Sequence, residues 1–179
     1  YDAVKHVAKL PFVDATRIGV TGHSNGALAC REAVLQDAEG LIAAALLVSN
    51  DAVYYDENGN FYNQFGSRDA AIIACQYDEF FHRVNGNPPR EYMNQVTAQS
   101  FLHFGEDPTG LDEREQHLFY DRDGVIRAIF NPPITHPWAH FSKACVAFGV
   151  EFFDKALDAP NDIAPNSQIW QISRVFALT

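Results

Sequence analysis

The chain has 179 residues, 47% of them hydrophobic, and carries a formal charge of −10. This length and composition predict one globular domain with its own core and exclude a disordered chain. The acidic balance argues against a nucleic-acid partner, because phosphate backbones are bound by basic surfaces. Three widely spaced cysteines, Cys30, Cys75 and Cys145, favour small core residues over a disulfide framework or a zinc site.

The first informative stretch joins a strand pattern to a helix pattern. Residues 1–10 have a helical pattern, and the short apolar run at residues 18–21 predicts a buried strand. That run leads into Gly22-His23-Ser24-Asn25-Gly26, and a helical pattern follows at residues 27–36. Strand, sharp turn and helix around Gly-x-Ser-x-Gly are typical of a nucleophile elbow, so we expect Ser24 to be a nucleophile. We also expect Gly22 and Gly26 to be required, because a side chain there would collide with the neighbouring strand or helix.

Strand and helix patterns alternate along the rest of the chain. They are, in chain order, strands at 41–49 and 70–77, a helix at 90–104, a hairpin at 118–130 with Asp123-Gly124 at its turn, and a helix at 141–157. This alternation predicts an α/β fold with a mostly parallel sheet flanked by helices. Ligands of such sheets bind at the carboxyl ends of the strands.

Candidate catalytic side chains follow these strands in a suitable order. Asp78 comes directly after the strand pattern at 70–77, and His136 lies between the last strand and the last helix. A serine hydroxyl needs a base to take its proton, and a buried carboxylate holds the histidine ring in the required tautomer. Ser24, Asp78 and His136 are therefore the predicted catalytic triad.

Both partners of the serine have competitors. Asp51 follows the strand at 41–49, and Glu79 is adjacent to Asp78, so both are alternative acids. His140 is the alternative base, four residues after His136. Two histidines at this spacing also occur in metal sites, but no cysteine or acidic cluster accompanies them, and no metal is expected.

Three motifs resemble the α/β-hydrolase superfamily, close to its dienelactone-hydrolase and acetyl-xylan-esterase-like groups. They are the elbow around Ser24, the acid turn Cys75-Gln76-Tyr77-Asp78, and Thr135-His136-Pro137-Trp138 ahead of the last helix. The resemblance covers most of residues 1–157, and Cys75 stands where the family commonly has glycine. It implies hydrolysis of an ester, thioester or amide through an acyl-enzyme, without a cofactor, and a backbone N–H of Asn25 that donates to the oxyanion hole.

The resemblance also indicates what this sequence does not contain. Members of the family have several strands before the elbow, and the second oxyanion donor normally comes from a loop after one of them. We therefore expect residues 1–157 to be the C-terminal portion of a hydrolase domain. A carboxylesterase acting on a small-molecule ester or thioester is the expected activity. The alternatives are a prolyl-oligopeptidase-type serine peptidase, which uses the same residue order, and a hydrolase-fold module without activity that binds a partner or a membrane.

The tail differs in composition from the rest. Residues 158–179 are predicted to form a Pro-containing linker and then an amphipathic helix at 168–178. This helix fits docking on the domain, a partner contact or a membrane surface. The chain shows no leader segment and no apolar run of membrane-spanning length, so we expect a cytoplasmic or membrane-associated protein.

Overall fold

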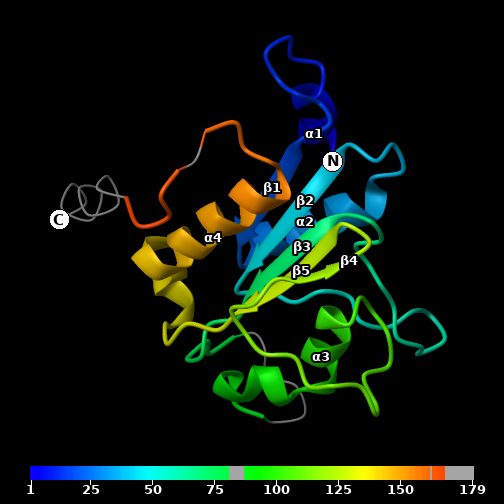
Figure 1. The fold of residues 1–179 in the computed structure, drawn as a ribbon, viewed down its shortest axis with the longest axis vertical. Helices are drawn as coiled ribbons and strands as arrows, with labels where there is room; N and C mark the ends of the chain where they lie inside the picture. Colours follow the sequence, from blue (N-terminus) through cyan, green and yellow to red (C-terminus); the bar gives the residue numbers. More distant parts are fainter. Residues whose placement is uncertain (81–86, 162, 168–179) are drawn as a thin grey trace.

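A computed structural model of the chain describes residues 1–80, 87–161 and 163–167. Within them one sheet has the strand order β1-β2-β3-β5-β4. The strands are β1 (Ile18–His23), β2 (Ile42–Val48), β3 (Asp69–Ile73), β4 (Tyr120–Arg122) and β5 (Val125–Phe130). Strand β4 alone among these is antiparallel to its neighbour. The predicted α/β architecture with a mostly parallel sheet is confirmed (Figure 1).

Helices cover both faces of this sheet. They are α1 (Asp2–Val7), α2 (Asn25–Gln36), α3 (Val96–Leu102) and α4 (Lys143–Ala156), with 3₁₀ helices η1 (Pro89–Asn94) and η2 (His136–Phe141). Helices α2 and α3 share one hydrophobic core with the sheet, and α4 shares another on the opposite face (Figure 1). The candidate site lies where loops that connect these strands and helices meet.

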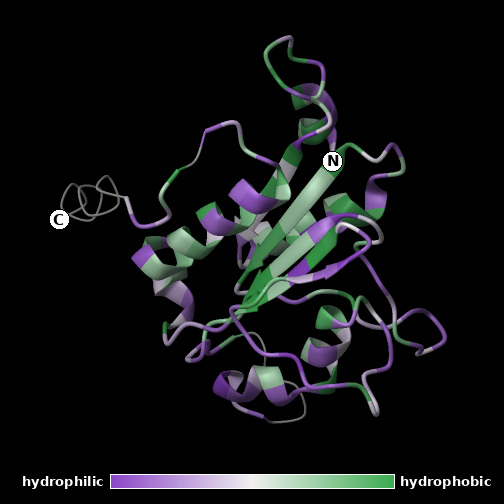
Figure 2. Ribbon diagram, in the orientation of Figure 1, coloured by the Kyte–Doolittle hydropathy of each residue, from purple (hydrophilic) through white to green (hydrophobic). Residues whose placement is uncertain are grey.

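The apolar run in β2 explains how the two cores share one sheet. Successive strand residues point to opposite faces, and Ala45 and Leu47 enter the core with α2 and α3, whereas Ala44 and Leu46 enter the core with α4. All four are at most 2% exposed. A parallel strand covered on both faces needs such a continuous apolar sequence. Figure 2 shows that the central strands are largely hydrophobic.

The predicted hairpin forms with a two-residue turn. Asp123 and Gly124 have φ values of 55° and 80°. Positive φ at both central residues is the geometry of a type I′ turn, which matches the twist of the flanking strands.

Two predictions for the middle of the chain are wrong in extent. The helix predicted at 90–104 is interrupted at Gln95, whose ψ of 140° is extended, so η1 and α3 form instead. Tyr92 in η1 is fully buried, and its hydroxyl donates to Asp51 2.6 Å away. This long-range contact prevails over the local helical pattern. The strand predicted at 70–77 ends at Ile73. Pro132 and Pro133 in the neighbouring segment lack the N–H groups that a continued ladder needs.

At the two ends of the chain the predictions have different outcomes. The helix predicted at 1–10 is shorter than expected, because α1 spans Asp2–Val7 only. The helix predicted at 168–178 lies outside the described residues. Among the residues that are described, none of the helices combines the length and the apolar character needed to span a membrane.

Candidate active site

The strand register brings the carboxyl ends of the parallel strands to one level. His23 of β1 pairs with Val48 of β2, Val48 pairs with Ile73 of β3, and Ile73 pairs with Phe130 of β5. Residues that directly follow these positions therefore emerge along one edge of the sheet. The segments that carry Ser24, Asp51, Asp78 and His136 all begin there.

Ser24 occupies the turn between β1 and α2 in a strained backbone conformation. Its φ of 58° and ψ of −119° are rarely adopted by a residue with a side chain. The Ser24 N–H donates to the carbonyl of Val48 at 2.9 Å, and Ser24 is the N-cap of the 12-residue helix α2. The elbow geometry expected from the sequence is present, with the serine at the positive end of the helix dipole.

The two glycines of the elbow differ. A Cβ at Gly22 would stand 2.3 Å from the carbonyl carbon of Gly26, so glycine is required there, as predicted. The collision predicted at Gly26 is wrong, because a Cβ there meets no described atom within 4 Å. Gly26 is exposed in the first turn of α2, so a side chain there has open space, although the Gly26 backbone is what crowds Gly22.

Beyond β3 and β5, backbone hydrogen bonds join the acid turn (residues 75–78) to the segment at residues 131–136, the histidine loop. The N–H of Gln76 donates to Pro132, the N–H of Tyr77 donates to Ile134, and Tyr77 forms a parallel bridge with Thr135. Asp78 and His136 are the next residues along the two segments. They therefore leave the paired segments side by side.

Asp78 and His136 form a buried pair. The Nδ1 of His136 lies 2.9 Å from Oδ2 of Asp78, and the two residues are 7% and 1% exposed. A carboxylate only accepts hydrogen bonds, so the pair fixes the tautomer with a proton on Nδ1 and a lone pair on Nε2. The other Asp78 oxygen accepts the N–H of Phe80 at 2.9 Å. This arrangement leaves Nε2 able to act as a base.

His23 links the elbow to this pair. Its Nε2 lies 2.8 Å from the carbonyl oxygen of His136, and the two rings are 4.7 Å apart. Burial lowers the pKa of His23, and the neighbouring histidines His136 and His140 lower it further. His23 is therefore neutral at pH 7 and donates from Nε2 to the His136 carbonyl. The described contacts hold the histidine loop against the elbow through His23, the residue next to Ser24.

The competing side chains lie in different environments. Asp51 accepts a hydrogen bond from Tyr92 at 2.6 Å and another from Tyr54. Glu79 is exposed and accepts the backbone N–H of His136 at 3.2 Å, so it supports the histidine loop and not the histidine ring. His140 is exposed and its ring lies 4.9 Å from that of His23. Of the candidate acids, the described geometry brings Asp78 to a histidine ring.

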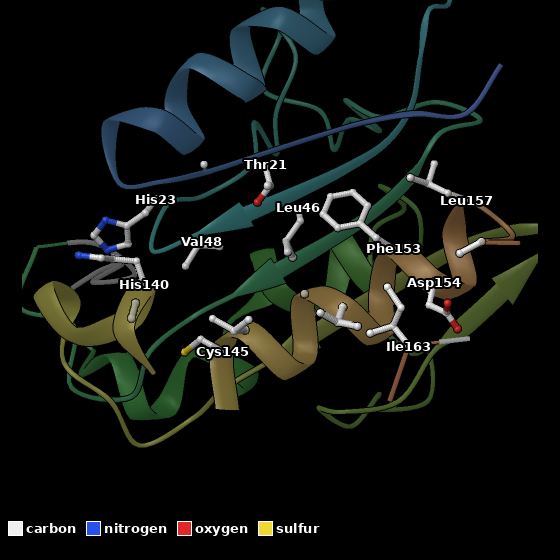
Figure 3. A pocket seen from close by; sticks show the side chains of 16 residues that line it. Thr21, His23, Leu46, Val48, His140, Cys145, Phe153, Asp154, Leu157 and Ile163 are labelled. Carbon is white, nitrogen blue, oxygen red and sulfur yellow. The ribbon is translucent and has the colours of Figure 1, made fainter. Parts of the chain in front are cut away.

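Next to the elbow lies an apolar groove of about 550 Å³ that is lined by residues of β1, β2 and α4. Figure 3 shows His23 and His140 at one end and Leu46, Phe153 and Ile163 along the rest. Strand β1 has β2 on one side and, in the described part of the chain, no strand on the other. The groove therefore lies beside β1, the outermost strand of the described sheet, which leads into the elbow.

The aromatic residues near the site are solvent-exposed. Tyr77, Phe80 and Trp138 are 55%, 68% and 59% exposed, which excludes them from the core. The Phe80 ring meets the His136 ring edge-on at 4.9 Å. Phe80 therefore shields one side of the candidate base.

Asn50 is the site residue that sequence reasoning missed. It is 4% exposed, and its side-chain Nδ2 donates to the carbonyl of Ser24 at 3.0 Å. An asparagine just after a buried strand at the sheet's carboxyl edge is the only sequence signal that pointed to it. Among the described residues no group of three or more His, Cys, Asp or Glu side chains is arranged to hold a metal ion.

Comparisons with family models and with curated proteins assign no family to the chain. No family model matches the sequence, and no curated protein matches it significantly.

Proposed function

We propose that the chain carries the catalytic residues of a serine hydrolase of the α/β-hydrolase type, acting on a carboxylic ester or thioester. The observation that carries the proposal is the strained Ser24 elbow, which the neighbouring residue His23 links to the buried Asp78–His136 pair. Backbone strain of this kind costs about 1–3 kcal/mol and persists where surrounding structure maintains it, often at functional sites. A buried carboxylate that orients a histidine near such an elbow fits nucleophilic catalysis.

The proposed reaction has two steps, acylation of Ser24 and hydrolysis of the acyl-enzyme. In the first, Ser24 Oγ attacks the carbonyl carbon while His136 Nε2 takes the hydroxyl proton, and the proton then passes to the leaving alcohol or thiol as the acyl-enzyme forms. In the second, water attacks the acyl-enzyme, His136 takes a proton from that water, and the acid product leaves as the proton returns to Ser24. Asp78 stays ionised and stabilises the imidazolium of each step.

The proposed oxyanion donor is the backbone N–H of Asn25. Asn25 is the first residue of α2, and N–H groups in the first turn of a helix have no acceptor within the helix. A fixed N–H near the developing oxyanion contributes more in a water-poor site than in bulk solvent. The reaction needs no cofactor.

A fluorophosphonate probe tests the proposal on the full-length protein. We expect the wild type to be labelled covalently, the Ser24→Ala variant to be unlabelled, and the label to map to Ser24 by mass spectrometry. Absence of labelling in the folded wild type would contradict the proposed hydrolase and favour a module without activity. Parallel assays with p-nitrophenyl acetate and a chromogenic dipeptide amide separate an esterase from a peptidase, because an esterase releases nitrophenol and leaves the amide intact.

A further inference from the structure

Asn50 fixes the backbone of the elbow from the neighbouring strand. It lies two residues after the end of β2, and its Nδ2 donates to the carbonyl oxygen of Ser24 at 3.0 Å. Its Oδ1 in turn accepts the backbone N–H of Asp51 at 2.7 Å. Both ends of the buried amide are therefore engaged, so the side chain has one defined orientation.

The carbonyl that Asn50 binds belongs to the peptide unit between Ser24 and Asn25. That unit is planar and trans, so its C=O and N–H point in opposite directions. The same oxygen also accepts the N–H of Leu28 at 3.0 Å, the first hydrogen bond of α2. Two donors from different elements thus fix the oxygen of this peptide, and with it the direction of the Asn25 N–H.

The strain in the elbow explains why such a restraint is needed. With φ at 58° and ψ at −119°, Ser24 gains by rotating towards a common conformation, and rotation of ψ would turn the following peptide. On the β1 side, the N–H of Ser24 is held by the Val48 carbonyl. Asn50 supplies the matching restraint on the helix side. Both restraints come from the end of β2.

We propose that Asn50 is a positioning residue that aims the Asn25 N–H at the oxyanion. The proposal rests on the proposed hydrolase function, in which Ser24 is the nucleophile. Asn50 touches neither substrate nor reacting atoms. It acts by keeping the Ser24–Asn25 peptide in the orientation that the transition state requires.

Variants of Asn50 with a matched control test this role. Asn50→Ala removes the amide, and Asn50→Asp keeps its shape while replacing the donor with an acceptor that repels the Ser24 carbonyl. Gln64 is the control, because it is also a buried amide, 5% exposed, that donates to a carbonyl of α2 (Arg31, 3.1 Å) and accepts a loop N–H (Val53, 2.7 Å). Gln64→Ala therefore removes a similar pair of hydrogen bonds away from the elbow.

Steady-state kinetics with p-nitrophenyl butyrate give the first measurement. Loss of one oxyanion donor costs about 10²–10³-fold in kcat, and misorientation of that donor is expected to cost roughly 10–100-fold. We expect this fall for Asn50→Ala and at least as large a fall for Asn50→Asp, with KM and the pH dependence of kcat unchanged. Gln64→Ala should retain kcat within about threefold at a temperature where all variants are folded. Equal losses of kcat in Asn50→Ala and Gln64→Ala, or none in Asn50→Ala, would overturn the proposal.

Amide NMR gives a second measurement that does not need activity. In Asn50→Ala we expect the Asn25 resonance to shift and broaden through exchange between peptide orientations, whereas Gln64→Ala leaves it unchanged. A sharp, unshifted Asn25 resonance in Asn50→Ala would refute the positioning role even if the wild type is inactive. If fluorophosphonate leaves the wild type unlabelled while Asn25 still moves, the hydrolase function fails and the structural restraint stands.

Discussion

The two ends of the parallel sheet hold their buried carboxylates in different ways. At the amino end, Asp37 follows α2 and accepts hydrogen bonds from the Tyr1 hydroxyl at 2.7 Å, the Leu41 and Ile42 N–H groups at 2.9 Å, and the Arg68 guanidinium at 3.0 Å. Burial by itself raises the pKa of Asp37, but these donors outweigh it and lower the pKa to about 2. Asp37 is thus surrounded by donors that favour its charged form.

At the carboxyl end, Asp78 is buried to a similar degree but faces a histidine. Its Oδ2 lies against His136 Nδ1, and an imidazole that donates from one nitrogen can accept a proton on the other. Burial of a carboxylate therefore does not by itself indicate catalysis. Static donors around Asp37 stabilise the fold, whereas a histidine partner that His23 links to the strained elbow makes Asp78 a candidate for chemistry. Substitutions at each end should therefore differ in effect, with losses of activity at the carboxyl end and losses of stability at the amino end.

The largest expected effect separates the two histidines of the carboxyl end. His136→Gln removes the proposed base and is expected to lower kcat for p-nitrophenyl acetate by about 10⁶-fold. His140→Gln changes an exposed ring and should retain activity within about tenfold. Initial rates of both variants, with folding checked by circular dichroism, make this comparison. A larger loss in His140→Gln would assign the base to His140.

The next effect separates the two carboxylates that follow β2 and β3. Asp78→Asn presents the wrong hydrogen-bonding partner to His136 Nδ1 and is expected to lower kcat by about 10⁴-fold. Asp51→Asn keeps an oxygen that accepts from Tyr92 and should lower kcat by less than about tenfold. Stopped-flow measurement of acylation compares them directly. The reverse order of losses would make Asp51 the acid.

At the amino end the expected loss is in stability. The pKa of Asp37 in the folded state, about 2, lies below its ordinary value of 3.8, so this carboxylate stabilises the fold above pH 4. That contribution, roughly 2 kcal/mol, is lost as the pH falls from about 4 to about 2. Asp37→Asn should lower the free energy of unfolding by a similar amount at pH 7 and flatten its dependence below pH 4. Urea titrations between pH 2 and 7 measure both, and an unchanged acid slope would contradict the prediction.

The smallest effect concerns the strain at the elbow. Glycine adopts the positive φ of Ser24 without steric cost, so Ser24→Gly should be more stable than Ser24→Ala by about 1 kcal/mol. Both variants lack the proposed nucleophile, which makes them a matched pair. Their melting temperatures should differ by a few degrees. Equal melting temperatures would indicate that Ser24 is not strained and would weaken the comparison between the two ends.

Much of the fold follows from local patterns. The pentapeptide around Ser24, the apolar strand β2 and the Asp123-Gly124 turn each contain their own signal within a few residues. The type I′ turn and the elbow need particular backbone angles, and the residues that tolerate those angles are few. The break at Gln95 was not predicted, because it depends on the buried hydroxyl of Tyr92 reaching Asp51, which is 41 residues away in sequence.

The candidate site divides in the same way. Residue order and periodicity predicted the elbow and placed Asp51, Asp78, His136 and His140 after strands or beside a helix start, because both are local properties of the chain. The folded chain was needed to show which carboxylate meets which histidine, and that Asn50 reaches the Ser24 carbonyl. Such pairings depend on the register between strands far apart in the chain and on the backbone bonds that join the loops beyond them. Sequence spacing does not encode that register directly, whereas the packed sheet fixes it.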